Sequence, residues 1–410
     1  MTPMRVLHVV PHLDRVGGYE RQAATLARHQ RSRHSADPIL LTHGEGSRPS
    51  FEQGQEGEVH RLRKGLLRHH PASWWRQHGE RIDVVHCHAM HKLSGQVLAL
   101  AHNAGLPTLV KVATEDDVAM FADPRGWERL VATREDDVDD GLRGARWRFM
   151  VKSAWRRLRR ARSFVALHDG IAAQLEEHGL GSVRLPNGVD TDHFRPPTTS
   201  QRAAARERLG LPVDACCLAY VGRLAPRKHV VDLVHAFLRL ANRATGRVFL
   251  LLAGDGPERP ALEAQLTSSP YARRVRWIGE VADVRPVLHA ADILAHPSRR
   301  EGMPNAVLEA WACGLPTVLS DIPAHRSMIA GPGETVALLH PLGDVASLSA
   351  RLAGLAEAPA RRALLGAAAR RRALKLHGIE RIERAYDELY HELVSGAARQ
   401  PATSMSAGAS

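Results

Sequence analysis

Short apolar segments alternate with helical patterns along the first half of the chain. Because these segments are apolar on both faces, they predict buried strands of a parallel sheet covered by helices on each side. The predicted strands are Arg5–Val10, Ile39–Thr42, Asp83–His88, Thr108–Ala113 and Ser163–Leu167, and the predicted helices are Tyr19 to about His29 and Ser94–Asn103.

The same alternation begins again after Pro196-Pro197. The predicted strands of this second half are Cys217–Val221, Val248–Ala253, Val275–Ile278, Ile293–Ala295 and Thr317–Ser320. The predicted helices are Val230–Ala241, Pro257–Leu266 and Pro304–Cys313, the last one closed by Gly314. Two such halves predict two doubly wound α/β domains with a cleft between them.

Composition agrees with a globular protein of two or three domains, because the 410 residues are 44% hydrophobic and 24% charged. No apolar run has the length of a membrane span, and the N-terminal run is too short for a signal peptide. The four cysteines form no CxxC pair, which argues against a zinc site and a disulfide framework. We therefore expect a cytoplasmic protein.

Net charge is the unusual bulk property, at +12. Basic proteins bind phosphate in nucleic acids, anionic lipids or small molecules. A run at 146–162 combines arginines with Trp147 and Trp155 at helical spacing. One interpretation is a helix on an anionic membrane surface, and the other is a helix packed on the sheet. The segment 61–78, with its tryptophan pair, is a second membrane candidate.

The strongest chemical signal is the segment Arg300-Glu-Gly-Met-Pro-Asn-Ala-Val-Leu-Glu-Ala310. It follows a predicted strand and enters a helix, with Pro304 expected in the first helical turn. Backbone N–H groups of residues 303–306 would then form an anion site suited to a diphosphate. Glu301 and Glu309 offer carboxylates to sugar and ribose hydroxyls.

A second basic loop stands at the end of another predicted strand, in Tyr220-Val-Gly-Arg-Leu-Ala-Pro-Arg-Lys228. Arginine presents a fork to phosphate oxygens and lysine a point charge. This loop therefore predicts further contacts to phosphate.

These two segments resemble the family 4 retaining glycosyltransferases, whose E-x7-E signature matches Glu301 to Glu309. The resemblance implies a GT-B architecture, with two Rossmann-like doubly wound domains facing each other across a cleft. It implies that Glu301 contacts the donor sugar, that Glu309 binds the nucleotide ribose, and that Arg223 and Lys228 hold the donor diphosphate. It also implies that backbone groups between the two glutamates hold sugar and phosphate.

Three further segments resemble the same family. Leu185-Pro-Asn-Gly-Val-Asp190 is similar to its interdomain stretch, and Leu252-Ala-Gly-Asp-Gly-Pro257 to one of its turns. For Asn187 and for Gly254–Gly256 we favour a structural role, because Asn-Gly and Asp-Gly are good turn formers. Trp277–Val281 resembles the loop that faces the base, which implicates Val281 and Asp283.

In the first half, Gly17-Gly18 lies between the first strand and its helix. Glycine lets a backbone approach phosphate closely, yet the GxGxxG fingerprint is missing, which disfavours a nicotinamide enzyme. The resemblance places this loop near the donor phosphate and the acceptor, and places His88 beside the reacting centre. The neighbouring His86 and His91 raise the alternative of a metal site, which we consider a chance cluster among 24 histidines.

The chain departs from the common family pattern on the acceptor side. Thr114 and Glu115 stand where many members have a histidine, and His168 where a serine is frequent. An acidic run at 115–140 lacks the EF-hand spacing, so we interpret it as a solvated segment rather than a Ca²⁺ or Mg²⁺ site.

The prediction is a two-domain retaining glycosyltransferase that moves a sugar from a nucleoside-diphosphate sugar to an acceptor hydroxyl on a glycan, a lipid-linked molecule or a small molecule. Domains are expected at 1–190, which binds the acceptor, and 191–375, which binds the nucleotide sugar. A final helix at 379–394 is expected to pack back on the first domain, and a tail at 395–410 to be disordered.

The predicted site needs no metal or other cofactor beyond the nucleotide-sugar co-substrate. The implied catalytic residues are His88, Arg223, Lys228 and Glu301. The implied donor-binding residues are Gly17, Gly18, Arg223, Lys228, Val281, Asp283, Glu301, Gly302, Met303, Pro304, Asn305 and Glu309.

Alternatives remain open. A nucleotide-sugar 2-epimerase or a sugar phosphorylase would share the fold, and a nucleic-acid-binding protein would account for the charge. The last has no RNP motif or zinc finger to support it. Base, sugar, acceptor, linkage and oligomeric state are not specified by the sequence.

Overall fold

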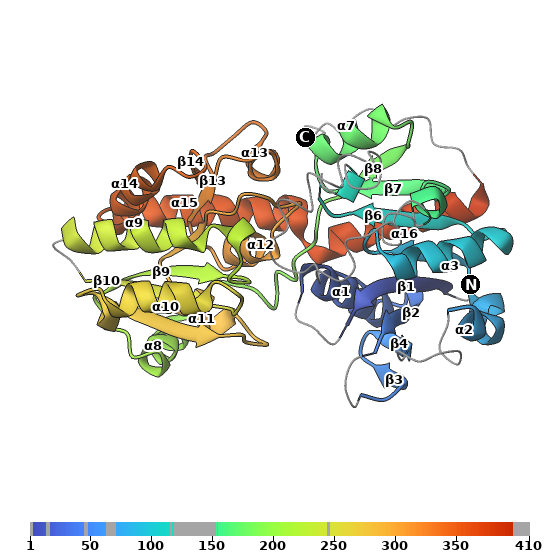
Figure 1. The fold of residues 1–410 in the computed structure, drawn as a ribbon, viewed down its shortest axis with the longest axis horizontal. Coiled ribbons are helices and arrows are strands. Elements are labelled where there is room, and N and C mark those ends of the chain that lie inside the picture. The colour runs from blue at the N-terminus through green and yellow to red at the C-terminus, as the bar shows by residue number, and fades with distance from the viewer. Residues whose placement is uncertain are drawn as a thin grey trace. The chain divides into compact units, whose positions relative to one another are not determined.

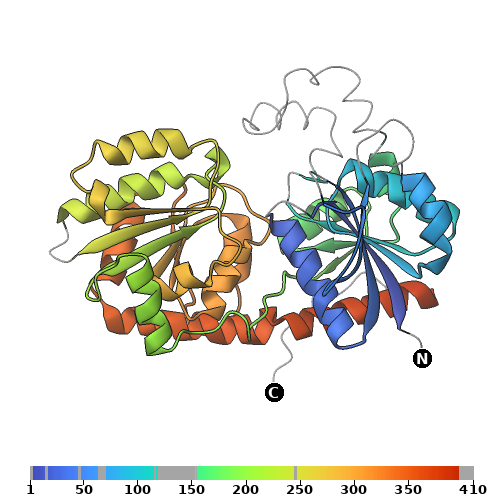
Figure 2. The ribbon, with the colours of Figure 1, turned by 90° about the horizontal axis from the view of Figure 1, so that it is seen from below.

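The computed structural model describes residues 3–13, 17–44, 48–62, 71–114, 117–118, 153, 155–243 and 247–396. The chain divides into two compact units. Unit 1 comprises Met1–Gly188 and Ile379–Ser410, and unit 2 comprises Val189–Gly378. Figures 1 and 2 show helices on both faces of the sheet in each unit.

Unit 1 is built around an eight-stranded sheet in the order β3-β4-β2-β1-β5-β6-β7-β8. Its strands are β1 (Met4–His12), β2 (Ala36–His43), β3 (Phe51–Gly54), β4 (Gly57–Leu62), β5 (Val84–Cys87), β6 (Thr108–Val112), β7 (Ser163–Ala166) and β8 (Ser182–Arg184). Its helices are α1 (Gly18–Ser32), α2 (Pro71–His78), η1 (Gly79–Arg81), α3 (Lys92–Asn103), α7 (Asp169–Glu177) and α16 (Ile379–Ser395).

The C-terminal helix α16 completes the core of unit 1. Its apolar face buries Ile382, Tyr386, Leu389, Tyr390 and Leu393 against residues of β1, β5, β6 and β7. Apolar residues recur at the helical period along this segment, which explains why it forms a long helix with one buried face. Burying such a side chain stabilises the unit by about 1.5–3 kcal/mol.

Unit 2 contains a six-stranded parallel sheet in the order β11-β10-β9-β12-β13-β14. Its strands are β9 (Cys216–Val221), β10 (Val248–Ala253), β11 (Val275–Gly279), β12 (Ile293–His296), β13 (Thr317–Ser320) and β14 (Leu338–His340). Its helices are α8 (Thr199–Arg208), η3 (Pro226–Lys228), α9 (Val230–Arg243), α10 (Arg259–Thr267), η4 (Ala272–Arg274), α11 (Arg285–Ala290), α12 (Asn305–Ala312), α13 (Pro323–Ile329), α14 (Val345–Ala356), α15 (Pro359–Arg372) and the π-helical turn η5 (Ala373–His377).

Both sheets reverse their strand order next to their first strand. In unit 2 the reversal lies between β9 and β12, and in unit 1 between β1 and β5. Ligands of open α/β sheets bind beyond the carboxyl ends of the strands at such a switch point. The topology therefore predicts that ligands bind at the loops after β9 and β12 in unit 2, and at the loops after β1 and β5 in unit 1.

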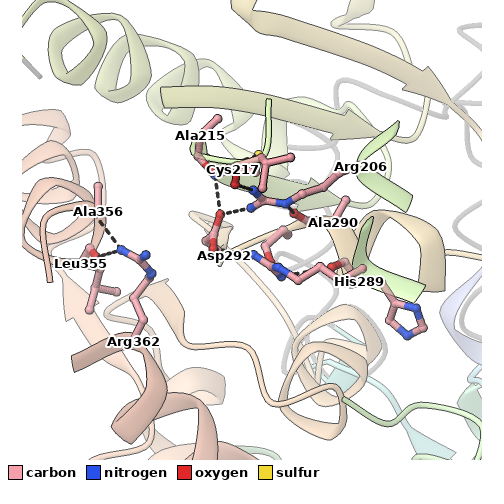
Figure 3. Close-up of polar contacts among 12 residues, drawn as sticks. Arg206, Ala215, Cys217, His289, Ala290, Asp292, Leu355, Ala356 and Arg362 are labelled. Atoms are coloured by element: carbon pink, nitrogen blue, oxygen red, sulfur yellow. Dashed lines mark hydrogen bonds and ion pairs between the residues drawn. The ribbon is translucent and has the colours of Figure 1, made fainter. Parts of the chain in front are cut away.

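A partly buried ion-pair network holds α8 against the N-terminal ends of β9 and β12, as Figure 3 shows. The two Oδ atoms of Asp292 accept from Arg202 Nη2 and Arg206 Nη2, each at 2.6 Å. Asp292 Oδ2 also accepts from the backbone N–H of Cys217 at 2.8 Å. Because Asp292 precedes β12 and Cys217 lies in β9, this network fixes the relative register of the two strands that carry the switch point.

The structure corrects two expectations from the sequence. The unit 1 sheet is not wholly parallel, because β3 pairs antiparallel with β4. Pro304 is the N-cap residue of α12, with extended backbone angles, and does not lie within the first turn. The helix therefore begins at Asn305, and the first backbone N–H groups to bond back to the Pro304 carbonyl are those of Val307 and Leu308.

Several predicted features lie outside the described residues. These are Glu115, most of the acidic run, the first part of the basic run and the tail from residue 397 onward. Of the basic run, the stretch 155–160 is described, with Leu158 fully buried and Arg156, Arg157, Arg159 and Arg160 exposed. Trp74 of the second membrane candidate is buried and stacks on His78.

Candidate functional site

The loop after β9 carries the first cations of the unit 2 site. Gly222 directly follows β9 and has a positive φ of 149°, which a residue with a side chain rarely adopts. The Tyr220 hydroxyl then donates to the Arg223 carbonyl at 2.8 Å, which fixes the turn. The short helix η3 follows and presents Lys228 at its last position, whereas the Arg223 side chain is exposed.

Glu301 lies at the centre of this site. Its carboxylate oxygen Oε1 accepts from Lys228 Nζ in an ion pair and from His296 Nε2 at 2.8 Å. The side chain of Glu301 is 9% exposed and that of Lys228 is 12% exposed. Sequence separation between Lys228 and Glu301 is large, and the pair forms because β9 and β12 are neighbours in the sheet.

The electrostatics of Glu301 keep it ionised. Burial alone raises the pKa of its carboxyl, but Lys228, the His296 hydrogen bond and Arg227 together hold that pKa well below its usual value. An ionised carboxylate is the form that accepts hydrogen bonds from hydroxyl groups. Glu301 is therefore suited to bind a polyol such as a sugar.

His296 is a site residue that the sequence did not reveal. It is the last residue of β12, it is 2% exposed, and it donates to the carboxylate of Glu301. Tyr220 stacks on its ring, with centroids 6.0 Å apart and planes 14° apart. Its position directly before Pro297-Ser298 was visible in the sequence, but no spacing rule connects it with a glutamate five residues later.

Glu309 lies in α12 and is 5% exposed. Gly302, Met303 and Pro304 are buried in the turn that leads into this helix, and Asn305 is half-buried. The predicted donor-binding residues of this segment thus follow Glu301 directly and surround the start of α12.

The predicted base-contacting residues occupy the loop after β11. Val281 is half-buried and Asp283 is exposed. The Asp283 carboxylate accepts from Arg285 through Nε at 2.9 Å and Nη2 at 2.8 Å, and these hydrogen bonds lower the pKa of its carboxyl. It also accepts from the Arg285 backbone N–H at the start of α11. Asp283 is therefore engaged with Arg285, the first residue of α11, in this structure.

The backbone conformation explains why glycine stands at the predicted structural turn Gly254–Gly256. Gly254 and Gly256 have φ values of 136° and 158°. A Cβ at Gly254 would lie 1.9 Å from the Gly222 carbonyl oxygen, and one at Gly256 would lie 2.3 Å from the Leu224 carbonyl oxygen. Asn187 accepts from Lys111 Nζ at 2.7 Å. Burial lowers the pKa of this lysine to about 7.

In unit 1, Gly17 is the N-cap residue of α1 and Gly18 begins the helix. A Cβ on Gly17 would lie 2.1 Å from the Glu20 Oε2 atom, so the loop has room only for glycine unless Glu20 moves. His88 follows β5, on the other side of the switch point, and is 1% exposed.

Three buried imidazoles, those of His8, His86 and His88, gather in unit 1 with ligand nitrogens within 4.8 Å of one another. His8 Nδ1 lies 2.8 Å from His88 Nε2, and His8 Nε2 lies 3.0 Å from Gln30 Oε1. Both nitrogens of His8 are thus engaged, which leaves one nitrogen each on His86 and His88. Zinc sites use three or four protein ligands, so the arrangement fits a hydrogen-bonded cluster better than a metal centre.

Solved structures with the same fold define the class of protein. Sucrose-phosphate synthase from Thermosynechococcus elongatus matches with a TM-score of 0.77 at 21% identity, over 96% of this chain and 100% of that one. Anabaena HepE in complex with UDP and glucose matches with a TM-score of 0.75 at 17% identity, over 95% and 99% of the two chains. The fold is of the GT-B type, with two Rossmann-like units.

Family comparisons cover both units. The profile for "Glycosyltransferase Family 4" matches residues 16–193, and that for "Glycosyl transferases group 1" matches residues 215–358. A D-inositol 3-phosphate glycosyltransferase 2 from Catenulispora acidiphila is 32% identical over 66% of this chain and 62% of its own length. The lipopolysaccharide core glycosyltransferase LpsE from Rhizobium meliloti is 38% identical over 28% of this chain and 33% of its own length.

The chain belongs to the family 4, group 1 glycosyltransferases. The aligned parts span less than two thirds of these curated relatives.

Proposed function

We propose that the protein transfers a glycosyl group from a nucleoside-diphosphate sugar to an acceptor hydroxyl. The observation that carries this proposal is the largely buried group of Lys228, Glu301 and His296 at the switch point of unit 2. It combines a cation for a phosphate with an ionised carboxylate for sugar hydroxyls. The nearby Glu309 supplies a second buried carboxylate, suited to ribose hydroxyls.

The proposed chemistry stabilises the leaving group. As the bond between the anomeric carbon and the phosphate oxygen breaks, negative charge grows on the nucleoside diphosphate. Arg223, Lys228 and the start of α12 are the groups that would stabilise this charge. The acceptor oxygen bonds to the anomeric carbon, and its proton passes to the departing phosphate. No cofactor beyond the donor is needed in this scheme.

A screen of nucleotide sugars tests the proposal. Thermal shifts with UDP-, GDP- and ADP-sugars should identify a donor, since a ligand at a hundredfold excess over its Kd stabilises by about 2.7 kcal/mol. UDP is the first choice because HepE was solved with UDP and glucose. Donor-dependent product on an added acceptor distinguishes a transferase from a 2-epimerase, and phosphate dependence would reveal a phosphorylase. Salt-sensitive DNA binding without any donor affinity would instead favour a nucleic-acid-binding protein.

We expect retention of configuration at the transferred anomeric carbon. The site offers cations and a sugar-binding carboxylate, and the proposed transfer of the acceptor proton to the leaving phosphate requires attack on the same face. NMR of the first-formed product from a donor of known configuration measures the outcome. An inverted product would contradict the same-face scheme while leaving transferase activity intact.

We also propose a cytoplasmic protein that binds the inner membrane surface peripherally, because Arg156, Arg157, Arg159 and Arg160 are exposed beside the buried Leu158. Among the described residues no helix is long and apolar enough to cross a bilayer. Replacing the four arginines by glutamine should weaken binding to anionic vesicles by roughly 1 kcal/mol per cation at low salt.

Vesicle flotation measures this effect, with a control in which exposed arginines of unit 2 become glutamine. The control positions are Arg208, Arg243, Arg351 and Arg361. Equal losses in the two variants would assign binding to net charge. Equal recovery of the wild type on neutral and anionic vesicles would remove the proposal.

A further inference from the structure

A chain of hydrogen bonds crosses the interior of unit 1 and ends at His88. Gln30 Nε2 donates to Asp387 Oδ1 at 3.3 Å, and Gln30 Oε1 lies 3.0 Å from His8 Nε2. His8 Nδ1 lies 2.8 Å from His88 Nε2. The four side chains come from α16, α1, β1 and the loop after β5. His8 and Gln30 are fully buried and His88 is 1% exposed.

Burial raises the pKa of Asp387, and the hydrogen bond from Gln30 opposes this rise. The ionised carboxylate sets the direction of every hydrogen bond in the series. Reversing the Gln30 amide would place its oxygen against the Asp387 carboxylate, so the amide oxygen faces His8. His8 must then carry its proton on Nε2 and accept at Nδ1. His88 therefore carries its proton on Nε2, and its Nδ1 is an unprotonated acceptor.

Burial keeps both imidazoles neutral, which this assignment requires. Desolvation lowers the pKa of His8 to about 4, against a smaller raising effect of Gln30. The pKa of His88 is also well below its usual value, through burial first and then through the neighbouring histidines and Lys111. Each ring is therefore a neutral tautomer near pH 7.

The His88 ring is held in place by its neighbours. His86 stacks on it, with centroids 4.0 Å apart and planes 28° apart, and His86 is itself tied to the Tyr390 hydroxyl at 2.7 Å. His88 Nδ1 has no hydrogen-bond partner among the described residues. A buried acceptor without a partner costs about 1–3 kcal/mol, and such a group calls for a functional reason.

We propose that Gln30 and His8, anchored by Asp387, are positioning residues that hold His88 in one tautomer, so that its Nδ1 accepts a hydrogen bond from a hydroxyl of the acceptor substrate. The proposal rests on the proposed transfer reaction and names the residues of unit 1 that serve it. His88 Nδ1 is buried, so the groups that cover it move when the substrate binds. The tautomer is set before binding, so the His88 ring itself need not change its protonation during the reaction.

Two substitutions of His8 separate positioning from packing. In His8→Asn the amide oxygen stands in for Nδ1 and still accepts from His88 Nε2, whereas His8→Leu removes the acceptor. We expect His8→Leu to lower kcat tenfold or more with an unchanged KM for the donor, whose predicted binding groups lie mainly in unit 2. His8→Asn should retain most of the wild-type kcat.

Histidine-selective ¹⁵N NMR of the full-length protein supplies the direct readout. The wild type and His8→Asn should show His88 protonated on Nε2, and His8→Leu should show a mixture of tautomers. His88 protonated on Nδ1 in the wild type would overturn the proposal, as would equal kcat and equal tautomers in the two variants. Absence of transfer with every donor would refute the proposed function instead, and the tautomer measurement would still stand.

Discussion

Replacing Lys228 by alanine should lower kcat about 10²–10³-fold, or about 2.7–4 kcal/mol in transition-state stabilisation. The side chain of this lysine is 12% exposed and pairs with Glu301. Its removal takes away charge that would stabilise the diphosphate leaving group. The Glu301 carboxylate then keeps its contact with His296 Nε2 at 2.8 Å but loses its cation, so the group proposed to bind the sugar is perturbed as well.

The neighbouring Arg227→Ala provides the matched control. Arg227 lies in the same short helix, but its side chain is exposed and its effect on the pKa of Glu301 is the smallest of those named, so its loss should change kcat by no more than about threefold. The assay is initial rate against donor concentration, with circular dichroism to confirm folding. Equal rates for Lys228→Ala and the wild type would show that the lysine does not stabilise the leaving group.

The same assay tests whether a metal takes part. Because the proposed site neutralises the diphosphate with Arg223, Lys228 and the start of α12, wild-type activity should survive EDTA. Activity that is lost in EDTA and restored by Mg²⁺ would mean that a metal ion neutralises the diphosphate. Glu309→Ala should behave unlike Lys228→Ala and raise KM for the donor, since ribose hydroxyls are bound equally in ground and transition states.

The second large effect is structural. Gly254→Ala should destabilise unit 2 by roughly 2–6 kcal/mol, the sum of backbone strain and overpacking. The glycine has a φ of 136°, and an added Cβ would meet the Gly222 carbonyl oxygen at 1.9 Å. That oxygen belongs to the loop that leads to Arg223, and the Gly254 N–H donates to the Gly279 carbonyl at 2.7 Å. Neither backbone segment can move without disturbing the carboxyl ends of β9 and β10.

Gly343→Ala separates strain from crowding in the same unit. Gly343 also has a positive φ, 77°, but a Cβ there has nothing within 4 Å. Its substitution should cost roughly 1–2 kcal/mol. Urea unfolding followed by tryptophan fluorescence compares the two variants. Equal losses of unfolding free energy would show that the close contact with the Gly222 carbonyl oxygen adds little to the cost of the substitution.

Sequence patterns predicted the central strands because most of their residues are apolar. The edge strand β3 was missed, since the burial pattern of Phe51–Gly54 is exposed at three positions and carries no alternation. Helix α15 was also missed, because its arginine-rich sequence has a weak apolar face. Propensity and pattern are informative only where burial repeats at a regular period.

For the site, local motifs identified Lys228 and Glu301 but not their contact, which depends on the adjacency of β9 and β12. His8 and His88 are 80 residues apart, and their hydrogen bond follows from the parallel register of β1 and β5. Pairings of this kind arise from topology. The roles of the predicted donor-binding residues stay predictions.

The return of α16 to unit 1 has a consequence for the order of folding during synthesis. Unit 2 is one continuous stretch, Val189–Gly378, whereas unit 1 is built from two separate segments that flank it. Domains generally fold as they emerge from the ribosome, N-terminal parts first. Here the strands of unit 1 are translated first, but their core is complete only when Ile382, Tyr386 and Tyr390 of α16 pack against them. We expect unit 2 to reach its native state first, and unit 1 to complete its core only after residues 379–395 have been translated.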